Sequence, residues 1–456
     1  MEKTTIAAIA TSPGVGGIGI IRISGEEAFS VVAKIFSPKD AFFDVINPTP
    51  NVIKYGYIYD NKEKIDEVMV SFFKAPFSYT KENVVEINCH GGIVVVRKIL
   101  EKVIEAGARI AEPGEFTKRA FLNGRIDLTQ AESIIDIITS KTDRARSVAM
   151  VQLEGFLSQK INQIQSQIYD VLIQIEAGID YPEHEIEDVT RETLNKVLIN
   201  TKSELEKLYN SFEEGRVLKE GVRTAILGKP NVGKSSLMNM LLREERAIVT
   251  DIPGTTRDTI EEFVNIRGIP LRIIDTAGIR ETDDVIEEIG VNKAKKEIKE
   301  ADMIIAVFDI SRNLSEEDYE IIELIKNKKS IILINKIDLD EKWSASEIFE
   351  NKKVFNISAK TKIGIEELED EIEELWKNND IGTGEDIIIS NMRHKNLILE
   401  ALNSANQAID ALKVDMPVDM ISIDIKSLLE SLGTIVGQNV NEETINGIFS
   451  RFCLGK

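Results

Sequence analysis

A glycine-rich segment at residues 228–235 contains the first residues whose types and spacing suggest chemistry. It reads Gly-Lys-Pro-Asn-Val-Gly-Lys-Ser and matches the phosphate-binding loop pattern. Glycines let backbone N–H groups converge on phosphate oxygens, Lys234 can reach the β- and γ-phosphates, and the Ser235 hydroxyl can ligate Mg²⁺. The alternative is a glycine-rich turn that binds nothing. The pattern favours a nucleotide site, which we place between about Arg223 and Lys360.

A second motif, Asp275-Thr276-Ala277-Gly278, follows the apolar run at 271–274. A carboxylate at the end of a strand can hold Mg²⁺ through water, and the Gly278 N–H can meet the γ-phosphate. Such a motif is common in turns, but its distance from a phosphate loop makes it specific here.

A third motif, Asn335-Lys336-Ile337-Asp338, predicts which base is bound. The Asp338 carboxylate can accept two hydrogen bonds from the N1–H and the 2-amino group of guanine, a donor pair that adenine lacks. The segment Ser358-Ala359-Lys360 would close over the base. The sequence therefore predicts GTP rather than ATP.

The residue that would activate the attacking water is missing from its usual place. Ile279 stands where Ras-like GTPases carry a glutamine directly after the Asp-x-x-Gly motif, and an aliphatic side chain cannot orient water. Arg257 and Arg280 lie near in sequence, but neither can be identified as an arginine finger. Acidic candidates follow, each of which could also be a solvated loop charge: Glu281, Asp283, Asp284, Glu287 and Glu288.

Asn231 suggests a monovalent cation. An amide oxygen inside the phosphate loop can ligate such an ion, which would neutralise charge that develops between the β- and γ-phosphates.

The elements that must position these residues form distinct stretches. Residues 1–120 have a mixed α/β pattern, with strands at 18–23 and 84–87 and a helix at 94–105 that Gly107 ends. From Leu128 to about Gly215 the pattern is helical, with a last helix at 191–212. Residues 222–377 alternate strand and helix, which indicates a parallel sheet. The tail from about Asn391 returns to helix, punctuated by Pro417, Gly433, Gly437 and Gly447.

Composition narrows the class of protein. The 456 residues are 43% hydrophobic, enough for two or three cores, and no apolar run is long enough to span a membrane. The first residues lack the features of a signal peptide, so we expect a cytoplasmic protein with two free thiols, Cys89 and Cys453. With a net charge of −21, the overall electrostatic potential of the protein disfavours binding of nucleic acid. A local basic patch or a basic partner protein could still provide the positive charge that such binding needs.

One apparent motif is set aside. Residues 14–19 match the dinucleotide-binding fingerprint by letters, but that fingerprint must open a helix, whereas residues 18–23 are predicted to form a strand.

Several segments together resemble the MnmE (TrmE) family of tRNA-modification GTPases, over essentially the whole chain. The short GTPase motifs are shared with other families, whereas the N-terminal segments and the Cys-Leu-Gly-Lys tail are more specific. The segments that carry the resemblance are 13–25, 90–92, 113–117, 119–124, 254–258, 275–278 and 452–456.

The resemblance implies a multidomain α/β and all-α architecture. It predicts an N-terminal α+β folate-binding domain at 1–120 that dimerises, a helical domain at 121–220 and 378–456, and a Ras-like P-loop G domain at 221–377 inserted into the helical domain. It further implies K⁺-dependent GTP hydrolysis, activated when two G domains meet.

The resemblance also implies roles for individual residues. Glu287 stands at the position of the family's catalytic glutamate, which orients the attacking water. It would take the role of the glutamine that Ile279 replaces. K⁺ ligands would be Asn231, Thr250, Ile252 and Thr255, and Mg²⁺ ligands Ser235 and Thr256. The remaining GTP contacts are expected at Val232, Gly233, Lys234, Ser236, Asp251, Pro253, Gly254, Asp275, Thr276, Ala277, Gly278, Asn335, Lys336, Asp338, Ser358, Ala359 and Lys360.

In the N-terminal part, Arg22, Glu86, Arg125 and Lys456 fall on the family's folate-binding positions. A pterin ring presents an edge that Glu86 can pair bidentately, and basic groups suit the glutamate tail. Taken alone, Arg22 and Glu86 could be ordinary strand-face charges. Cys453 could be a reactive thiol or a small apolar core residue.

The implied function is a GTP-driven cycle that supports modification of tRNA wobble uridine 34. The partners would be a second copy, tRNA and the FAD-containing MnmG in a heterotetramer or larger complex, with no membrane. A 5,10-methylene- or 5-formyl-tetrahydrofolate would supply the carbon of a carboxymethylaminomethyl-type group. Two alternatives remain, a regulatory or ribosome-assembly GTPase switch and a folate enzyme with a regulatory G domain.

Overall fold

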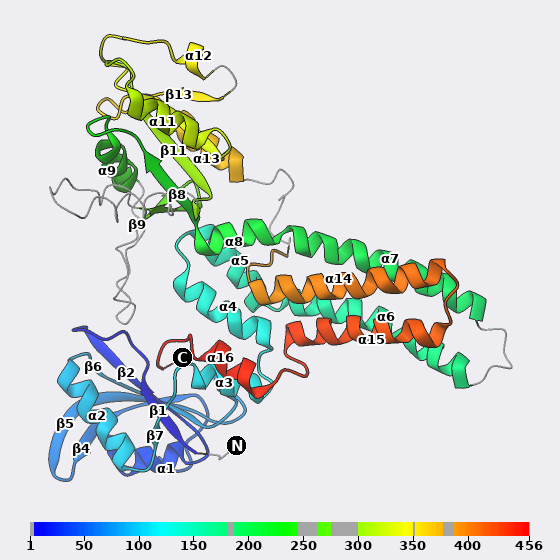
Figure 1. Ribbon diagram of the computed structural model, residues 1–456. Helices are drawn as coiled ribbons and strands as arrows, with labels where there is room; N and C mark the ends of the chain where they lie inside the picture. Colours follow the sequence, from blue (N-terminus) through cyan, green and yellow to red (C-terminus); the bar gives the residue numbers. More distant parts are fainter. Residues whose placement is uncertain are drawn as a thin grey trace, which may run out of the picture. The chain divides into compact units, whose positions relative to one another are not determined.

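The chain forms two compact units. Figure 1 labels their helices and strands. The computed structural model describes residues 4–180, 187–244, 262–274, 300–349, 352–376 and 387–455. The first unit comprises Met1–Ile135, Gln152–Gln174 and Ile425–Lys456, and the second Asp136–Val151 and Ile175–Asp424. None of the helices in these described ranges combines the length and the apolar character needed to cross a bilayer.

The first unit is built on a seven-stranded sheet in the order β3-β4-β5-β6-β2-β1-β7. Neighbouring strands are antiparallel except β1 and β7, which are parallel. The strands are β1 (Ile6–Ile9), β2 (Ile18–Ser24), β3 (Phe36–Pro38), β4 (Val52–Asp60), β5 (Glu63–Phe73), β6 (Val84–His90) and β7 (Arg109–Ile110).

Helices α1 (Ala28–Ala33) and α2 (Ile93–Glu105) cover one face of this sheet. Val32 and Ile99 from these helices are fully buried against strand residues such as Ile21 and Ile87. Because successive side chains of a strand point to opposite faces, Arg22 and Glu86 lie on the other face, opposite each other in register. The predicted strand at 18–23 is confirmed, so residues 14–19 do not open a helix.

Helical segments complete the first unit. Ala120 and Leu128 pack with Phe449 and Phe452 in an apolar cluster that joins the end of the chain to residues near 120. The helices involved in this unit are α3 (Glu115–Leu122), α4 (Leu128–Thr139), α6 (Phe156–Asp180), α15 (Val418–Val436) and α16 (Glu442–Phe449), of which α4, α6 and α15 extend into the second unit.

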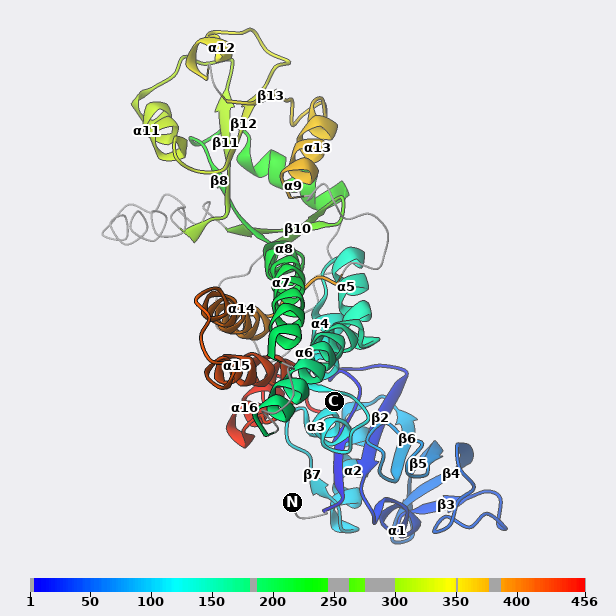
Figure 2. The same cartoon turned by 90° about the vertical axis from the view of Figure 1, so that its right-hand side faces the viewer.

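The second unit contains a six-stranded sheet in the order β13-β12-β11-β8-β10-β9, parallel except for β9. Helices α9 (Lys234–Glu244) and α13 (Ile365–Trp376) pack on one face, and α11 (Glu316–Ile325) with α12 (Ala345–Ile348) on the other (Figure 2). The strands are β8 (Val222–Leu227), β9 (Glu262–Ile266), β10 (Ile269–Ile274), β11 (Met303–Asp309), β12 (Ser330–Asn335) and β13 (Val354–Asn356).

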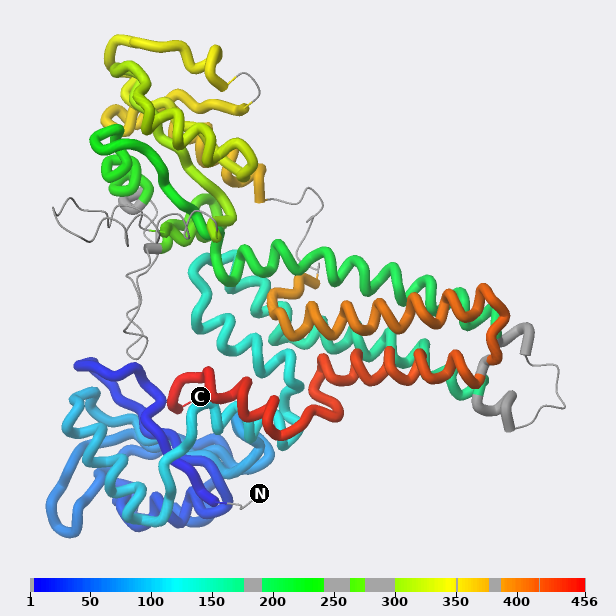
Figure 3. Tube along the Cα trace, viewed as in Figure 1, coloured from blue at the N-terminus to red at the C-terminus, as the bar shows by residue number. Residues whose placement is uncertain are grey.

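This sheet is inserted between helices that pack together. Helices α7 (Glu187–Asn210) and α14 (Met392–Lys413) run side by side (Figure 3). The chain leaves α8 (Phe212–Glu220) into β8, and on its return the Ile389 N–H donates to Ser211 Oγ at 3.2 Å. Since the entry and the exit of the sheet are neighbours, the predicted insertion is confirmed. Helix α5 (Asp143–Leu153) also belongs largely to this unit.

The helical stretch predicted to reach about Gly215 continues to Glu220, and two of the glycines that punctuate the predicted helical tail do not interrupt a helix. Gly215 lies inside α8, Gly433 inside α15 and Gly447 inside α16, whereas Gly437, with a φ of 99°, does follow a helix end. Close packing accounts for two of them: a Cβ atom on Gly215 would lie 2.2 Å from the Ile389 oxygen, and one on Gly433 would lie 2.7 Å from Gln438 Oε1. The predicted helix at 191–212 also ends earlier, at Asn210, and Phe212 begins the next helix.

Candidate functional site

The phosphate loop lies between β8 and α9, as the sequence predicts. Gly228 and Gly233 have φ values of 154° and 106°, in the region that favours glycine. A Cβ atom on Gly228 would lie 2.5 Å from the Val307 oxygen, and one on Gly233 would lie 2.1 Å from Asn335 Nδ2. The two glycines are therefore required by both backbone conformation and contact.

Lys234 is held at this loop by backbone carbonyls. Its Nζ donates to the oxygens of Gly228 and Lys229, the latter at 2.8 Å, and burial lowers the pKa of its ammonium group. Asn231, with a φ of 64°, and the Ser235 and Ser236 side chains are exposed at the loop surface. A bound phosphate would compensate the partly buried charge of Lys234.

Asn335 joins two loops of the site. Its side chain is 2% exposed; Nδ2 donates to the Val232 oxygen at 2.7 Å, and Oδ1 accepts from the Ala359 N–H at 3.1 Å. The phosphate loop and the segment at 358–360 are thereby tied to the end of strand β12.

The base-recognition residues are held by short polar contacts. Ser358 Oγ donates to Asp338 Oδ1 at 2.7 Å, which fixes one carboxylate oxygen. Lys336 Nζ pairs with Asp309 Oδ2 at 2.6 Å. Burial alone raises the pKa of Asp309, but the bonds from Lys336 and Ser311 outweigh it and hold that pKa below its ordinary value.

Lys229 is a residue that sequence reasoning missed. Its Nζ lies 2.5 Å from Asp318 Oδ2 and 3.0 Å from Ser315 Oγ, and the Asp318 side chain is 3% exposed. Ser315 and Asp318 form a capping box at the start of α11, a signal that the Ser-x-x-Asp spacing carries in the sequence. The phosphate loop is thus anchored to α11.

Part of the predicted nucleotide site lies outside the described residues. The positions concerned are Thr250, Asp251, Ile252, Pro253, Gly254, Thr255, Thr256, Asp275, Thr276, Ala277, Gly278 and Glu287, together with Ile279 and the neighbouring acids.

A second cluster lies on the face of the seven-stranded sheet that helices α1 and α2 do not cover. Arg22 Nε donates to Glu86 Oε1 at 2.8 Å, and Arg22 Nη1 donates to the Gly455 oxygen at 3.1 Å. Gly455 has a φ of 87°, and a Cβ atom there would lie 2.3 Å from the Ile9 oxygen. The C-terminal tail therefore lies against β1, beside the Arg22–Glu86 pair; Lys456 is outside the described residues.

Tyr79 connects this cluster to Arg125. The guanidinium carbons of Arg22 and Arg125 lie 5.4 Å and 4.6 Å from the centre of the Tyr79 ring, and Arg125 Nη1 donates to the Tyr79 oxygen at 3.2 Å. Phe116 lies under Arg22 at 5.7 Å. The structure thus brings Arg22, Glu86 and Arg125 together, and adds two aromatic residues that the sequence analysis did not identify.

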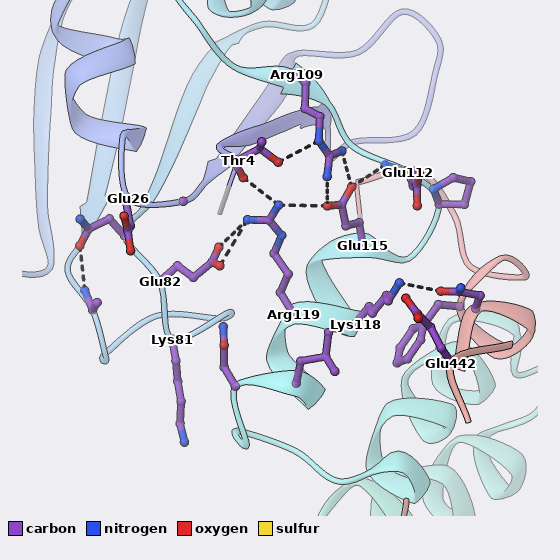
Figure 4. Close-up of a pocket in the computed structure, with 18 of the residues that line it drawn as sticks. Thr4, Glu26, Lys81, Glu82, Arg109, Glu112, Glu115, Lys118, Arg119 and Glu442 are labelled. Carbon is purple, nitrogen blue, oxygen red and sulfur yellow. Dashed lines mark hydrogen bonds and ion pairs between the residues drawn. The ribbon is translucent and has the colours of Figure 1, made fainter. Parts of the chain in front are cut away.

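A cavity of about 1170 Å³ lies elsewhere in the first unit (Figure 4). In its wall, Arg119 bonds to Glu82 at 3.0 Å and to Glu115 at 3.0 Å, and Arg109 bonds to Glu115. These charges pair with one another, and the predicted folate residues that the structure describes, Arg22, Glu86 and Arg125, do not line the cavity.

The two cysteines are free thiols, as predicted. Cys89 is buried and donates to the Gly19 oxygen, and burial raises its pKa to about 11, so it is unreactive. Cys453 is exposed, two residues before Gly455.

Comparison with known proteins places the chain in a family. Residues 5–125 match the family described as GTP-binding protein TrmE N-terminus, and residues 128–453 match the MnmE helical domain. The tRNA modification GTPase MnmE of Clostridioides difficile (strain 630) is 50% identical over 455 residues, which cover 99% of each chain. The protein of the same name from Acetivibrio thermocellus is 50% identical over 460 residues, 100% of each chain.

The chain belongs to the MnmE family. The family and the enzyme class predicted from the sequence, a GTPase of tRNA modification, are thereby confirmed. Among solved structures, the G domain of the T. maritima FeoB iron transporter is 27% identical, with a TM-score of 0.26 over 34% of this chain and 98% of that one. The MnmE helical match on both sides of the inserted sheet agrees with the observed insertion.

Proposed function

We propose that this MnmE-family chain hydrolyses GTP in a cycle that supports modification of wobble uridine 34 in tRNA. The observation that carries the GTP site is Asn335, whose buried amide holds the phosphate loop and the base-closing segment on one strand end. Lys234 would contact the β- and γ-phosphates, and Ser235 with Thr256 would hold Mg²⁺. Asp338, oriented by Ser358, would select guanine.

Hydrolysis would depend on K⁺ and on pairing of two G domains. The proposed K⁺ ligands are Asn231, Thr250, Ile252 and Thr255, and Glu287 would position the attacking water. The exposed position of Asn231 at the surface of the loop supports a role toward a cation. Replacing K⁺ by Na⁺ should slow phosphate release, and an equal rate in both salts would remove K⁺ from the proposal.

The residues around Arg22, namely Glu86, Tyr79, Phe116 and Arg125, form what we call the Arg22 cluster. This cluster would bind a tetrahydrofolate derivative, either 5,10-methylene- or 5-formyl-tetrahydrofolate. The observed residues fit this ligand: Glu86 is partly exposed and can pair with a pterin edge, Tyr79 and Phe116 offer flat surfaces, and Arg125 with Lys456 would suit a glutamate tail. When bound, the folate would supply a one-carbon unit. Cys453 is the proposed reactive thiol, since it is exposed beside the tail that contacts Arg22.

A homodimer would form through the N-terminal part. Ile53 on β4 and Met69 on β5 are 57% and 51% exposed, and register and alternation place both on the open sheet face with Arg22. Exposed apolar side chains on one face favour burial against a second copy. MnmG and tRNA complete the proposed complex. The proposed domain limits are 1–120, 121–220, 221–377 and 378–456.

Nucleoside analysis of tRNA tests this function. A strain that lacks the gene should lose the carboxymethylaminomethyl-type group at uridine 34, and the gene encoding the wild-type chain should restore it, whereas one encoding Lys234→Ala should not. Unchanged wobble uridine in the deletion strain would contradict the proposal. Cosedimentation with ribosomal subunits would then favour the alternative, a ribosome-assembly GTPase.

A further inference from the structure

The β9–β10 hairpin meets helix α5 at its turn. Arg267 and Gly268 form the turn, with φ values of 48° and 88°. A Cβ atom built on Gly268 would lie 3.7 Å from Cβ and 3.9 Å from Cδ of Arg144, in α5. The aliphatic part of Arg144 therefore lies next to the turn, at a distance where a side chain at position 268 would make ordinary van der Waals contact with it.

A second contact joins the same helical region to strand β9. Lys141 precedes α5 by two residues, and its ammonium nitrogen lies 5.4 Å from the centre of the Phe263 ring. Both contacts belong to the second unit, so they connect the inserted sheet to the helices within one compact body.

The guanidinium group of Arg144 points to another element. Nη2 donates to Glu214 Oε1 of α8 at 2.7 Å, and the Glu214 side chain is 4% exposed. Displacing a charged partner from a buried carboxylate is costly, so movement of Arg144 is coupled to α8. Helix α8 reaches β8 through Gly221 alone, and β8 ends at the phosphate loop.

The opposite side of the turn is fixed to α13. Arg267 pairs with Glu369 at 3.4 Å, with Glu373 at 3.6 Å and with Asp370. The turn therefore has partners in α13 and in α5, and a shift of the hairpin must alter at least one of these contacts.

Both ends of the hairpin border segments predicted to contact the nucleotide. Strand β9 begins at Glu262, after the proposed metal-binding positions at 250–256, and β10 ends at Ile274, directly before Asp275. The two strands pair from Ile266 and Ile269 at the turn to Glu262 and Ile273, so they move as one ribbon. Coupling between distant sites is carried by packed elements that can adopt two discrete arrangements, which is what the experiment below tests.

We infer that Arg144 is a positioning residue that transmits nucleotide-dependent movement of the β9–β10 hairpin to helices α5 and α8. The inference rests on the proposed GTP cycle, because the movement it transmits is the difference between the GTP-bound and GDP-bound states.

Hydrogen–deuterium exchange of the full chain tests this role, in GDP and in a non-hydrolysable GTP analogue, with Mg²⁺ and K⁺ present. In the wild-type chain, exchange in α5 and α8 should differ between the two nucleotides. In Arg144→Ala this difference should be lost, while the difference in α9 remains. Arg146→Ala is the matched control: Arg146 lies on the same helix and pairs with exposed Asp143 at 2.8 Å, so the difference should persist.

The outcomes separate transmission from plain stabilisation. If Arg144→Ala raises exchange in α5 equally in both nucleotides and preserves their difference, the inference is wrong. If Arg144→Ala does not fold, Arg144→Met is the second variant, because it keeps the aliphatic stem beside Gly268 but loses the bond to Glu214. Arg144→Met should lose the difference in exchange between the two nucleotides in α8 alone. If that difference persists in α8, the inference is also wrong. A wild-type chain that fails to hydrolyse GTP would instead contradict the proposed function.

Discussion

The nucleotide site and the Arg22 cluster hold their polar groups in different ways. At the nucleotide site, side chains bond to the backbone of neighbouring loops, as Lys234 does to the Gly228 oxygen and Asn335 to Val232 and Ala359. In the Arg22 cluster, a guanidinium group pairs with a carboxylate, lies against aromatic rings and binds the backbone of a tail 433 positions away. Bonds from side chains to loop backbone, with flanking ion pairs such as Lys229–Asp318, hold the first site, whereas an ion pair between strands, aromatic rings and the tail of the chain form the second.

The difference indicates how each site should respond to change. A site held by backbone contacts loses its shape when one buried amide is removed, because the freed N–H and C=O groups stay unpaired. A site held by side-chain charges keeps its scaffold when one charge is neutralised and loses mainly ligand affinity. If the sites are independent, each substitution should affect one activity and leave the other intact.

The largest effect is expected from Glu287→Ala. The proposed water-positioning carboxylate is removed, so the rate of GTP hydrolysis should fall on the order of 10²–10³-fold while GTP affinity stays nearly unchanged. Phosphate release and binding of a fluorescent GTP analogue measure the two quantities. Glu281→Ala, in the same acidic stretch, serves as the control, and hydrolysis by Glu287→Ala at the wild-type rate would return the role to another acid.

Asn335→Ala should weaken the binding of both GTP and GDP. It removes the two buried hydrogen bonds to Val232 and Ala359, each worth about 1–3 kcal/mol when a partner is left unpaired, so affinity should fall roughly tenfold or more. Titration of both nucleotides, together with a folate derivative, gives the measurement. Asn356→Ala, an exposed position on β13, is the control, and loss of folate binding by Asn335→Ala would show that the two sites are coupled.

Glu86→Gln should weaken folate binding and leave the nucleotide site unaffected, the reverse of Asn335→Ala. The variant keeps the shape of the side chain but loses its charge, so affinity for 5-formyl-tetrahydrofolate should fall roughly tenfold, as expected for one charge-assisted hydrogen bond. GTP hydrolysis should not change. Calorimetric titration measures the affinity, with Glu67→Gln on the same sheet as the control; unaltered folate affinity would remove Glu86 from the proposed site.

The smallest predicted effect is on the stability of the first unit, and it should appear only at acidic pH. Burial alone raises the pKa of Glu115, but bonds from Arg109, the Glu112 N–H and Arg119 outweigh it and hold that pKa below its ordinary value. The carboxylate therefore stabilises the first unit above the ordinary glutamate pKa of about 4.3, and this contribution declines as the pH falls further through the lowered folded pKa.

Pulse proteolysis in urea, with the fragments mapped to each unit, would follow this loss of stability. Glu115→Gln should make the first unit less sensitive to acid in this range. Trp343 and Trp376, both in the second unit, provide an internal control by fluorescence. The same acid dependence in Glu115→Gln as in the wild type would assign the effect to other carboxylates.

Local pattern predicted the strands and helices of the nucleotide site well. Residues 222–377 alternate strand and helix as predicted: β8 precedes Gly228, β12 ends at Asn335, and β13 precedes Ser358. Lys234 begins helix α9 directly after the phosphate loop, and Asp338 lies on the loop after β12. Gly433 and Gly447, which were predicted to punctuate the helical tail, lie inside helices, and Gly215 lies inside α8. Close contact with Ile389 accounts for Gly215, and close contact with Gln438 accounts for Gly433. A single glycine does not by itself show whether conformation or close contact requires it.

The phosphate loop, the preference for guanine and the family of the chain could be predicted from the residues alone, because they depend on short motifs with fixed spacing. The folded structure was needed to find Lys229 anchored on α11, Tyr79 and Phe116 beside Arg22, and Arg144 next to both the β9–β10 turn and α8. These contacts join residues far apart in the chain. Their geometry follows from how the elements pack, and spacing along the sequence does not contain it.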